Sequence, residues 1–403
     1  MVSSATTARV SRSVPSVSQL WRGLGDEDRG PQYHFGTHRS VPPRETLRRI
    51  QPLLRRAGIT RLANITDLDW IGIPVWQAIL PNGRLYSVSQ GKGLTHAQAQ
   101  VSALMEGLEQ FHAAQIQVPS VTETVGAMRR QLAYDPYALV LSEPSFLNDA
   151  MPIEWLPATD LTTGTETWVP RAVCDCNGTV SERLSLPLFR VSTNGLASGN
   201  TVAEALVHAL CEVIERDAVA RRGQGAAFVE VMVDLDTISS RLARQVLERF
   251  RQAGLTTLVT DASGPTGVPC YEVWVDHPDG PALGWGSGAH PQRATALIRA
   301  LTEAAQARAT YIAGSRDDLG RTNYRRDEID AGVRHYTQTV RPQRSFLDAP
   351  DLPRRSLPAD VHDLVRHVTA LTGMSPVAVD LTRPDFGLPV VFVVAPGLRK
   401  PRH

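Results

Sequence analysis

A pattern of alanine, leucine and acidic residues occurs three times in the chain, and it restricts the possible folds more than any other feature of the sequence. All copies share one spacing, and they are Ala97, Ala99, Ala103, Leu104, Glu106 and Glu109, then Ala203, Ala205, Ala209, Leu210, Glu212 and Glu215, then Ala294, Ala296, Ala300, Leu301, Glu303 and Gln306. The small residues recur with helical spacing, so each copy predicts a helix with one closely packing face. A repeated frame of this kind indicates three related structural units.

The first two copies each end in a pair of acidic residues three positions apart. Glu106 and Glu109 project from one side of their predicted helix, and Glu212 and Glu215 from one side of theirs. In most proteins such a pair is a solvated face. If the helices instead bring four carboxylates into a dry site, cations must neutralise them, and Mg²⁺ suits because it takes oxygen ligands and keeps phosphates as partners. We therefore expect the first two helices to lie side by side through their alanine faces, with Glu109 and Glu215 converging.

The composition excludes several functional classes. The 403 residues include 42 Lys and Arg against 41 Asp and Glu, so bulk charge favours neither nucleic acid nor an acidic partner. No apolar run approaches the roughly 20 residues that span a bilayer, and the N-terminus lacks the apolar core of a secretory signal. Four cysteines are too few for a disulfide scaffold, and Cys174 with Cys176 is only half a zinc site. We expect buried thiols in a cytoplasmic protein that binds neither nucleic acid nor membrane.

Helical and strand-like stretches alternate along the chain, which predicts an α/β or mixed α+β fold. Residues 1–35 lack clear periodicity, and we expect a flexible, loosely attached arm. Residues 36–403 contain no clean linker, so one large domain is predicted. The other expected elements are a helix after Pro42 and Pro43, strands within 59–85 with a hairpin turn at 81–84, strands at 155–161 and 167–174, buried strands at 227–234 and 256–261 around a helix at 240–253, a helix at 361–372, a strand within 374–382 and a final strand at 389–398.

The usual nucleotide-binding and catalytic motifs are absent from the sequence. It contains no P-loop, no G-x-G-x-x-G that opens a helix after a strand, no H-E-x-x-H and no G-x-S-x-G. Lys92 lies between two glycines, so its backbone and ammonium group can approach a phosphate closely. Arg216 directly follows Glu215, and a guanidinium group suits phosphate oxygens. Considered alone, Lys92 is typical of a turn lysine, and Arg216 of a residue paired with a neighbouring acid.

Four segments in a fixed order strongly resemble the YcaO proteins. They are GKG at 91–93, S-x-x-x-E-x-x-E at 102–109, STNGLASGNT followed by CEVIER within 192–216, and RALTEAAQAR at 299–308. The resemblance extends from about Gly36 to Leu398. It implies a single YcaO-type domain in which three related helix-containing units surround a nucleotide site. In that family ATP and Mg²⁺ serve to phosphorylate a backbone amide oxygen of a peptide, after which a nucleophile adds to the amide carbon and phosphate leaves.

The resemblance also implies roles for individual residues. Glu106, Glu109, Glu212 and Glu215 match the acidic positions that bind metal. Positions that match the nucleotide site are Ser102, Asn200, Glu204, Arg216, Gln306 and Arg308. We add Lys92 because of its flanking glycines, and Arg39 and Thr46 because the segment GTHRSVPPRETL resembles the opening segment of the family. No protein nucleophile is expected, because phosphorylation already turns the amide oxygen into a good leaving group.

These residues leave the product and the partners open. The opening segment resembles the compact branch of the family, whose members act alone or with a TfuA-like partner, and the ending PGLRKPRH lacks the PxPxP tail of partner-dependent members. Attack from within a precursor peptide gives an azoline or a macroamidine, and delivered sulfide gives a thioamide. We rank cyclisation slightly first, because an intramolecular nucleophile has a high effective molarity. The alternatives are a non-catalytic scaffold for ATP or peptide, and alanine faces that merely pack a homodimer, and a homodimeric enzyme is the overall expectation.

Overall fold

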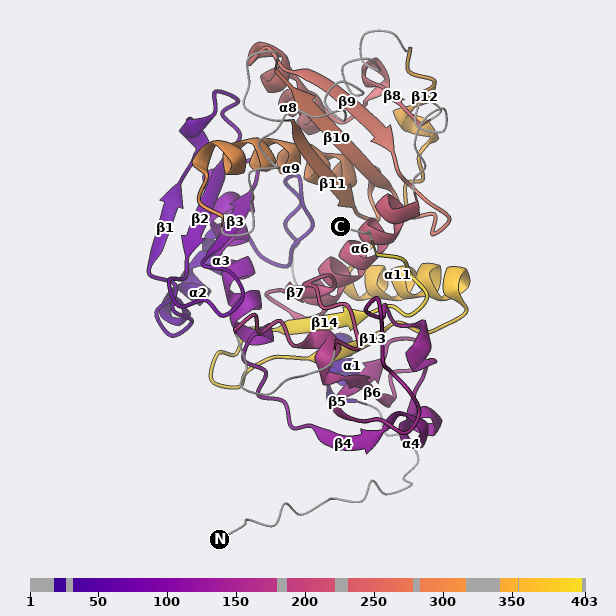
Figure 1. Cartoon of the computed structure of the whole chain (residues 1–403). Coiled ribbons are helices and arrows are strands. Elements are labelled where there is room, and N and C mark those ends of the chain that lie inside the picture. Colours follow the sequence, from indigo (N-terminus) through magenta and orange to yellow (C-terminus); the bar gives the residue numbers. More distant parts are fainter. Residues whose placement is uncertain are drawn as a thin grey trace.

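Each copy of the repeated pattern lies on a long helix that directly follows a strand (Figure 1). The strand–helix pairs, here named the first, second and third units, are β3 (Val88–Lys92) with α3 (His96–Ala113), β7 (Leu196–Ser198) with α6 (Val202–Arg221), and β11 (Gly284–Ala289) with α9 (Arg293–Ala313). The prediction of three helices is confirmed. The structure is a computed structural model that describes residues 18–26, 32–179, 187–221, 231–277, 283–316, 341–353 and 355–400.

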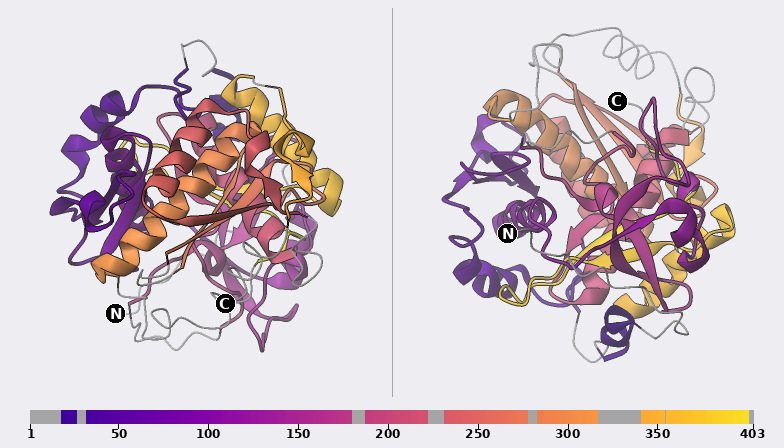
Figure 2. Two further views of the ribbon diagram at one scale, coloured as in Figure 1. Left: turned by 90° about the horizontal axis from the view of Figure 1, so that it is seen from above. Right: turned by 60° about the horizontal axis from the view of Figure 1, so that its bottom comes forward.

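The first and third units are built alike, because each closes an antiparallel sheet of three consecutive strands. The first sheet has the order β1-β2-β3, with β1 at Arg61–Asn64 and β2 at Val75–Ile79. The other has the order β11-β10-β9, with β9 at Thr256–Asp261 and β10 at Cys270–Asp276. Both helices pack back against their own sheets. Figure 2 shows the first sheet, in indigo and purple, beside the orange helix α9.

The second unit belongs to a larger antiparallel sheet. Its strands follow the order β4-β5-β13-β14-β7, with β6 paired to β5, and their bounds are β4 Val121–Thr124, β5 Pro152–Asp160, β6 Glu166–Pro170, β13 Val377–Asp380 and β14 Val390–Val394. Strand β14 lies between β13 and β7, and all its residues are buried. The predicted final strand is therefore confirmed, and it supports β7 directly.

The remaining elements include several that differ from the sequence expectations. Helices α2 (Pro43–Ile50), α8 (Arg241–Gln252) and α11 (Leu357–Thr372) appear where helices were predicted. The expected strand at 167–174 is wrong beyond Pro170, because Arg171–Cys174 forms the short helix α5. The strand expected at 227–234 is reduced to β8 (Val233–Asp234), paired with β12 (Arg344–Ser345), and residues 227–230 lie outside the described residues. Short helices complete the described chain: α4 Val125–Met128 and 3₁₀ turns at Gln51–Leu53, Thr66–Leu68, Arg129–Gln131, Pro136–Ala138, Leu235–Thr237 and Phe346–Asp348.

Part of the expected N-terminal arm is packed onto the body. Helix α1 (Gln19–Asp26) buries Leu20 and Leu24, one turn apart, in the same cluster as α6 and α11. Residues 18–26 are thus held by apolar contacts and are not loosely attached, whereas 1–17 and 27–31 lie outside the described residues. The domain boundary near residue 35 stays a prediction. Among the helices that the structure describes, none combines the length and apolarity needed to cross a bilayer.

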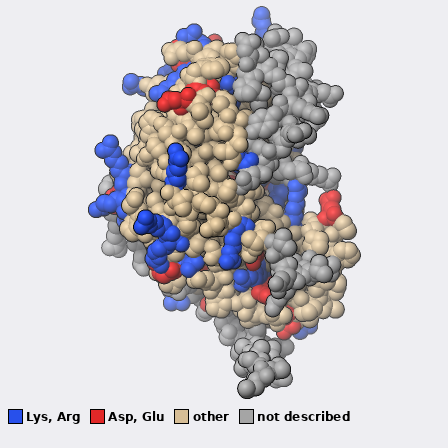
Figure 3. Space-filling view, turned by 60° about the vertical axis from the view of Figure 1, so that its left-hand side comes forward, with Lys and Arg blue, Asp and Glu red and all other residues tan. Residues whose placement is uncertain are grey.

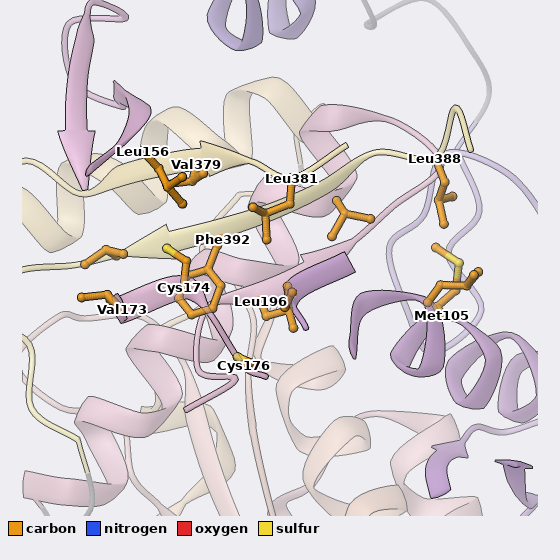
Figure 4. Packing of buried hydrophobic residues seen from close by; sticks show 14 of the residues in the cluster. Met105, Leu156, Val173, Cys174, Cys176, Leu196, Val379, Leu381, Leu388 and Phe392 are labelled. Carbon is orange, nitrogen blue, oxygen red and sulfur yellow. The ribbon is translucent and has the colours of Figure 1, made fainter. Parts of the chain in front are cut away.

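The apolar core holds all four cysteines as free thiols. Cys174, Cys176, Cys211 and Cys270 are buried and form no disulfide, as the sequence predicts. Figure 4 shows Cys174 beside Phe392, among side chains from the large sheet. Burial raises the pKa of Cys176 to about 12, so its thiol stays protonated at neutral pH. These thiols therefore act as small apolar packing groups.

The alanine faces of α3 and α9 pack against glycine-containing strands of the same chain, and the repeated alanines of α6 are buried in the core. On α9, Ala296 and Ala300 lie over Gly288 of β11, and Ala300 also lies over Gly286. On α3, Ala99 and Ala103 lie over Gly91 of β3 in the same way, and these alanines are fully buried. The expectation that α3 and α6 approach each other through alanine faces is therefore wrong, and so is the alternative that these faces form a homodimer interface.

A methyl group on Gly286 should destabilise the third unit. A Cβ atom there would lie 2.5 Å from the carbonyl oxygen of Ala300, so α9 must move away from its sheet. We expect Gly286→Ala to lower the free energy of unfolding by about 1–3 kcal/mol, as overpacking does. The matched control is Gly264→Ala, whose Cβ would meet no atom closer than 3.9 Å. Denaturant titration checks this, and equal effects of both substitutions would contradict the close packing.

Candidate functional site

A cavity of about 430 Å³ lies where the three units meet. Its walls come from β3, α3, the β7–α6 connection, α6, α9 and the segment before α2. It contains every predicted site residue except Arg308, namely Arg39, Thr46, Lys92, Ser102, Glu106, Glu109, Asn200, Glu204, Glu212, Glu215, Arg216 and Gln306. Figure 3 shows an outer face that is mostly uncharged, with scattered Lys and Arg side chains and fewer Asp and Glu, whereas the predicted carboxylates line the cavity.

Arg308 is the predicted residue that the structure places elsewhere. Its side chain is fully buried, and its Nε donates to Asp69 Oδ2 at 2.9 Å. Residues two positions apart on an α-helix lie about 200° apart around its axis, so Gln306 and Arg308 cannot face the same side. Gln306 faces the cavity, and Arg308 instead ties α9 to the turn after β1. The geometry therefore does not support a nucleotide contact by Arg308.

On the first helix Glu109 is buried and Glu106 half-buried, and the groups around them do not fully offset the cost of their ionisation. Glu109 accepts hydrogen bonds from the backbone N–H and the hydroxyl of Ser198, at 2.8 and 2.6 Å. Burial raises the pKa of Glu109 to about 8, and repulsion by Glu106 and Glu212 adds to the rise against the Ser198 hydrogen bonds. Burial also raises the pKa of Glu106, which accepts from the backbone N–H of Gln90 at 3.2 Å.

The acidic residues of the second helix are in a similar state. Burial raises the pKa of Glu212 to about 7; Arg216 acts in the opposite direction, and Glu215 adds to the rise. Glu215 accepts from the Ser287 hydroxyl at 2.6 Å and from the backbone N–H of Ala289 at 3.1 Å. Glu106, Glu109 and Glu212 thus have raised pKa values in one cavity, which is what a divalent cation neutralises, so these residues fit Mg²⁺.

Contacts between the three units close a ring around the cavity. Glu109 of α3 binds Ser198 of β7, and Glu215 of α6 binds Ser287 of β11. The third unit returns to the first through Lys92 Nζ and Glu303 Oε2, which lie 2.9 Å apart. Each helix therefore contributes an acidic side chain to the strand of the next unit, and no single unit forms the cavity alone.

The two cavity arginines Arg39 and Arg216 differ in how well acidic neighbours neutralise them. Burial lowers the pKa of Arg39; Glu204 opposes this shift, and Arg299 adds to it by like-charge repulsion. Arg216 Nη1 lies 3.7 Å from Glu215 Oε1, and the acids around it hold its pKa above the usual value despite burial. An anionic ligand between Arg39 and Arg299 would relieve their repulsion.

One end of the cavity is ordered by hydroxyl and amide groups. The Thr46 hydroxyl donates to Asn200 Oδ1 at 3.0 Å, and Asn200 Nδ2 donates to Glu204 at 3.1 Å. The opening segment thereby meets the start of α6, although the two are far apart in sequence. The family resemblance assigned these three residues to the nucleotide site, and the contact between Thr46 and Asn200 is an observation of the structure.

Sequence reasoning missed some residues that line the cavity, including Gln90, His208, Arg299 and Glu303. Glu303 was detectable, because it occupies the position of Glu106 and Glu212 in the repeated frame. His208 was also detectable, because it lies one helical turn from both Glu204 and Glu212. Burial lowers the pKa of His208, and repulsion by Arg299 adds to this effect, so its ring is neutral. Nothing in the sequence distinguished Gln90.

The carboxylates do not form a complete metal shell by themselves. Within the described residues, no group of three or more His, Cys, Asp or Glu side chains is arranged to hold a metal ion alone. Mg²⁺ usually keeps several water ligands and phosphate oxygens, so a partial set of one or two carboxylates per ion suffices. Taken with the basic groups, the arrangement defines a protein that holds an anionic ligand together with divalent cations in one buried cavity.

Comparison with known proteins identifies the family. A family model described as YcaO cyclodehydratase, ATP- and Mg²⁺-binding, matches residues 90–399. The chain therefore belongs to the YcaO family of ATP- and Mg²⁺-binding cyclodehydratases. A Mycobacterium tuberculosis protein is 37% identical over 383 residues, which cover 94% of this chain and 86% of that protein. A Rhizobium leguminosarum bv. trifolii protein from the tfuA 3′ region is 33% identical over 377 residues, covering 89% and 88%.

Solved structures confirm the fold at lower sequence identity. A YcaO from Methanopyrus kandleri, bound with AMPPCP and Mg²⁺, superposes with a TM-score of 0.70 at 23% identity, covering 91% of this chain and 93% of that one. A heterocyclase in complex with substrate and cofactor gives a TM-score of 0.75 at 24% identity. That match covers 94% of this chain and 55% of the heterocyclase, so the present chain spans about half its length.

Proposed function

We propose that this protein uses ATP and Mg²⁺ to activate, by O-phosphorylation, a backbone amide of a ribosomally synthesised precursor peptide, which leads to cyclodehydration to an azoline or a macroamidine. The observation that carries the proposal is one cavity that is lined both by partly unneutralised carboxylates and by Arg39, whose charge is also only partly neutralised. A triphosphate with Mg²⁺ satisfies both sets at once. The family membership of the chain supports the same assignment.

The side chains divide the work according to their charge. Glu106, Glu109, Glu212 and Glu215 are proposed to hold Mg²⁺ in this cavity. Arg216 lines the same cavity, with its Nη1 3.7 Å from Glu215 Oε1, and it is proposed to stabilise the charge that develops on the transferred phosphoryl group. Lys92 is available for the same role only if an anion displaces Glu303 from its ammonium group.

The remaining predicted residues are proposed to position the nucleotide. They are Arg39, Thr46, Ser102, Asn200, Glu204 and Gln306, and all of them line the cavity. His208 also lines the cavity, and burial with the neighbouring cations lowers its pKa, so its neutral ring is proposed to hydrogen-bond to a bound group and not to act as the base. ATP with Mg²⁺ supplies the phosphoryl group that converts the amide oxygen into a leaving group. The nucleophile then bonds to the amide carbon, the carbon–oxygen bond breaks, and phosphate departs with the former amide oxygen.

Thioamide formation is the second candidate, and one observation favours it. The Rhizobium relative, 33% identical, lies in a tfuA 3′ region. A TfuA-like partner and sulfide are therefore proposed as the alternative route, with sulfide as the nucleophile. A homodimer also stays a prediction, and it would use a surface other than the alanine faces.

The two chemical outcomes differ in the mass of the product. Purified protein, ATP, Mg²⁺ and the candidate precursor peptide should give a product that has lost one water. Product that appears only after a TfuA-like protein and sulfide are added, with a gain equal to sulfur minus oxygen, would replace cyclodehydration by thioamide formation. ATP binding without any peptide product under either condition would support the scaffold alternative.

A further inference from the structure

The segment 32–41, here named the strap, closes one side of the cavity. It turns back on itself at Gly36, whose φ of 68° lies in the left-handed region, and Tyr33 and Arg39 exchange two backbone hydrogen bonds. Gly36, Thr37 and Arg39 all line the cavity. The strap therefore forms a wall of the site, and its position decides where the Arg39 guanidinium lies.

The inner side of the strap is bonded to the second unit. The backbone N–H and the hydroxyl of Ser40 both donate to Glu204 Oε2, at 2.9 and 2.8 Å. Arg39 Nε lies 3.8 Å from Glu204 Oε1. Glu204 is almost completely buried on α6, so it receives the strap as a fixed acceptor. These contacts fix the side of the strap that faces the cavity, and other residues fix the opposite side.

A buried contact between a histidine and a carboxylate holds the other side of the strap, which faces away from the cavity. His38 Nδ1 lies 3.1 Å from Asp360 Oδ2, and both side chains are 1% exposed. His38 Nε2 lies 2.6 Å from Gln32 Oε1, which joins the two ends of the strap, and the ring of His34 stacks on His38 at 4.5 Å. Asp360 belongs to the first turn of α11, and α11 packs along α6. Loss of either partner leaves the other as a buried polar group without its neighbour, which is costly.

We infer that the His38–Asp360 pair positions the nucleotide, because it fixes the strap so that Arg39, the next residue, reaches the phosphates of ATP. The inference rests on the proposed function. His38 and Asp360 do not line the cavity, so they act through Arg39 and are positioning residues. Their contribution should be to nucleotide affinity, whereas the carboxylates and Arg216 determine the rate of phosphoryl transfer.

The test compares binding with turnover. We expect His38→Gln and Asp360→Asn each to raise the Kd for Mg²⁺ with AMPPCP by about tenfold, measured by calorimetry, with a similar rise in KM for ATP. The kcat at saturating ATP should stay within about twofold, since the chemical groups are untouched. Both side chains are buried, so each substitution can destabilise the fold. The two variants are therefore tested separately, and a melting curve of each shows whether it is folded.

The decisive comparison uses a double-mutant cycle with Arg39. In an Arg39→Ala background, His38→Gln should cause no further loss of affinity, because the pair acts only through Arg39. His367→Gln is the matched control, since His367 also ties α11 to the body, through Nδ1 and Thr266 O at 2.6 Å, but away from the strap. It should leave the Kd unchanged.

Each outcome has a defined meaning. Additive losses in the cycle, an unchanged Kd in both variants, or an equal loss with His367→Gln would overturn the inference while the proposed function stands. If the unmodified protein binds no Mg²⁺–AMPPCP, the proposed function itself fails, and the inference fails with it.

Discussion

Glu212→Gln is expected to reduce ATP turnover by about 10²–10³-fold while the chain keeps its fold, which is the loss typical of removing one essential electrostatic group. Glu212 lines the cavity between the partly unneutralised acids, and its backbone contact to Gly195 is long, at 3.4 Å. An amide of the same shape preserves the packing but cannot neutralise a divalent cation. Phosphate release in the presence of peptide measures the effect.

The control for this substitution is Glu248→Gln on α8. Glu248 is an exposed glutamate that pairs with Arg251 of the same helix at 2.6 Å, far from the cavity in the fold. It should leave turnover unchanged. Undiminished turnover in Glu212→Gln, together with an unchanged requirement for Mg²⁺, would remove Glu212 from the metal site.

The ligand-free protein should lose stability as the pH rises from about 6.5 to 8, above the range in which the buried histidines act in the opposite direction, by an amount on the order of 2 kcal/mol. The pKa values of Glu212 and Glu109 are about 7 and 8 in the folded chain, against an ordinary value of 4.5. Between these values the folded state binds more protons than the unfolded state, so the free energy of unfolding falls with rising pH. Denaturant titration at several pH values measures the slope.

Two further measurements assign that slope to the cavity. The double variant Glu109→Gln and Glu212→Gln should flatten it, because neither amide titrates. Mg²⁺ with AMPPCP should restore stability at pH 8 in the unmodified protein, since the cations neutralise the ionised carboxylates. A slope that survives the double substitution must originate in other groups.

The site was more predictable than the arrangement of the helices around it. Repetition identified Glu106, Glu109, Glu212 and Glu215, because one spacing found twice with the same alanine frame is unusual for a solvated face. Applying the same frame fully would also have included Glu303. The prediction for Arg308 was not supported, because Arg308 lies about 200° around the helix axis from Gln306 and so faces away from the cavity.

The wrong prediction that α3 and α6 pack against each other through their alanine faces has a different physical origin. Small residues permit close approach to any partner, and they do not say whether the partner is a helix or a strand. The missing information was in the strands, since Gly284, Gly286 and Gly288 recur with a period of two just before α9. A row of glycines on one face of a strand indicates that a backbone lies directly over it. The contacts of the strap, in contrast, join residues too distant in sequence for any local pattern to reveal.

The position of β14 has a consequence for how the enzyme is made. This strand follows every other described strand in chain order, yet it lies between β13 and β7, and β7 leads into α6 with half of the proposed metal ligands. Domains can begin to fold while the ribosome is still adding residues. Here β7 has no partner on that side until residues 390–394 have been synthesised. Nascent chains should therefore be unable to capture ATP, and the activity begins only after this last strand has been inserted.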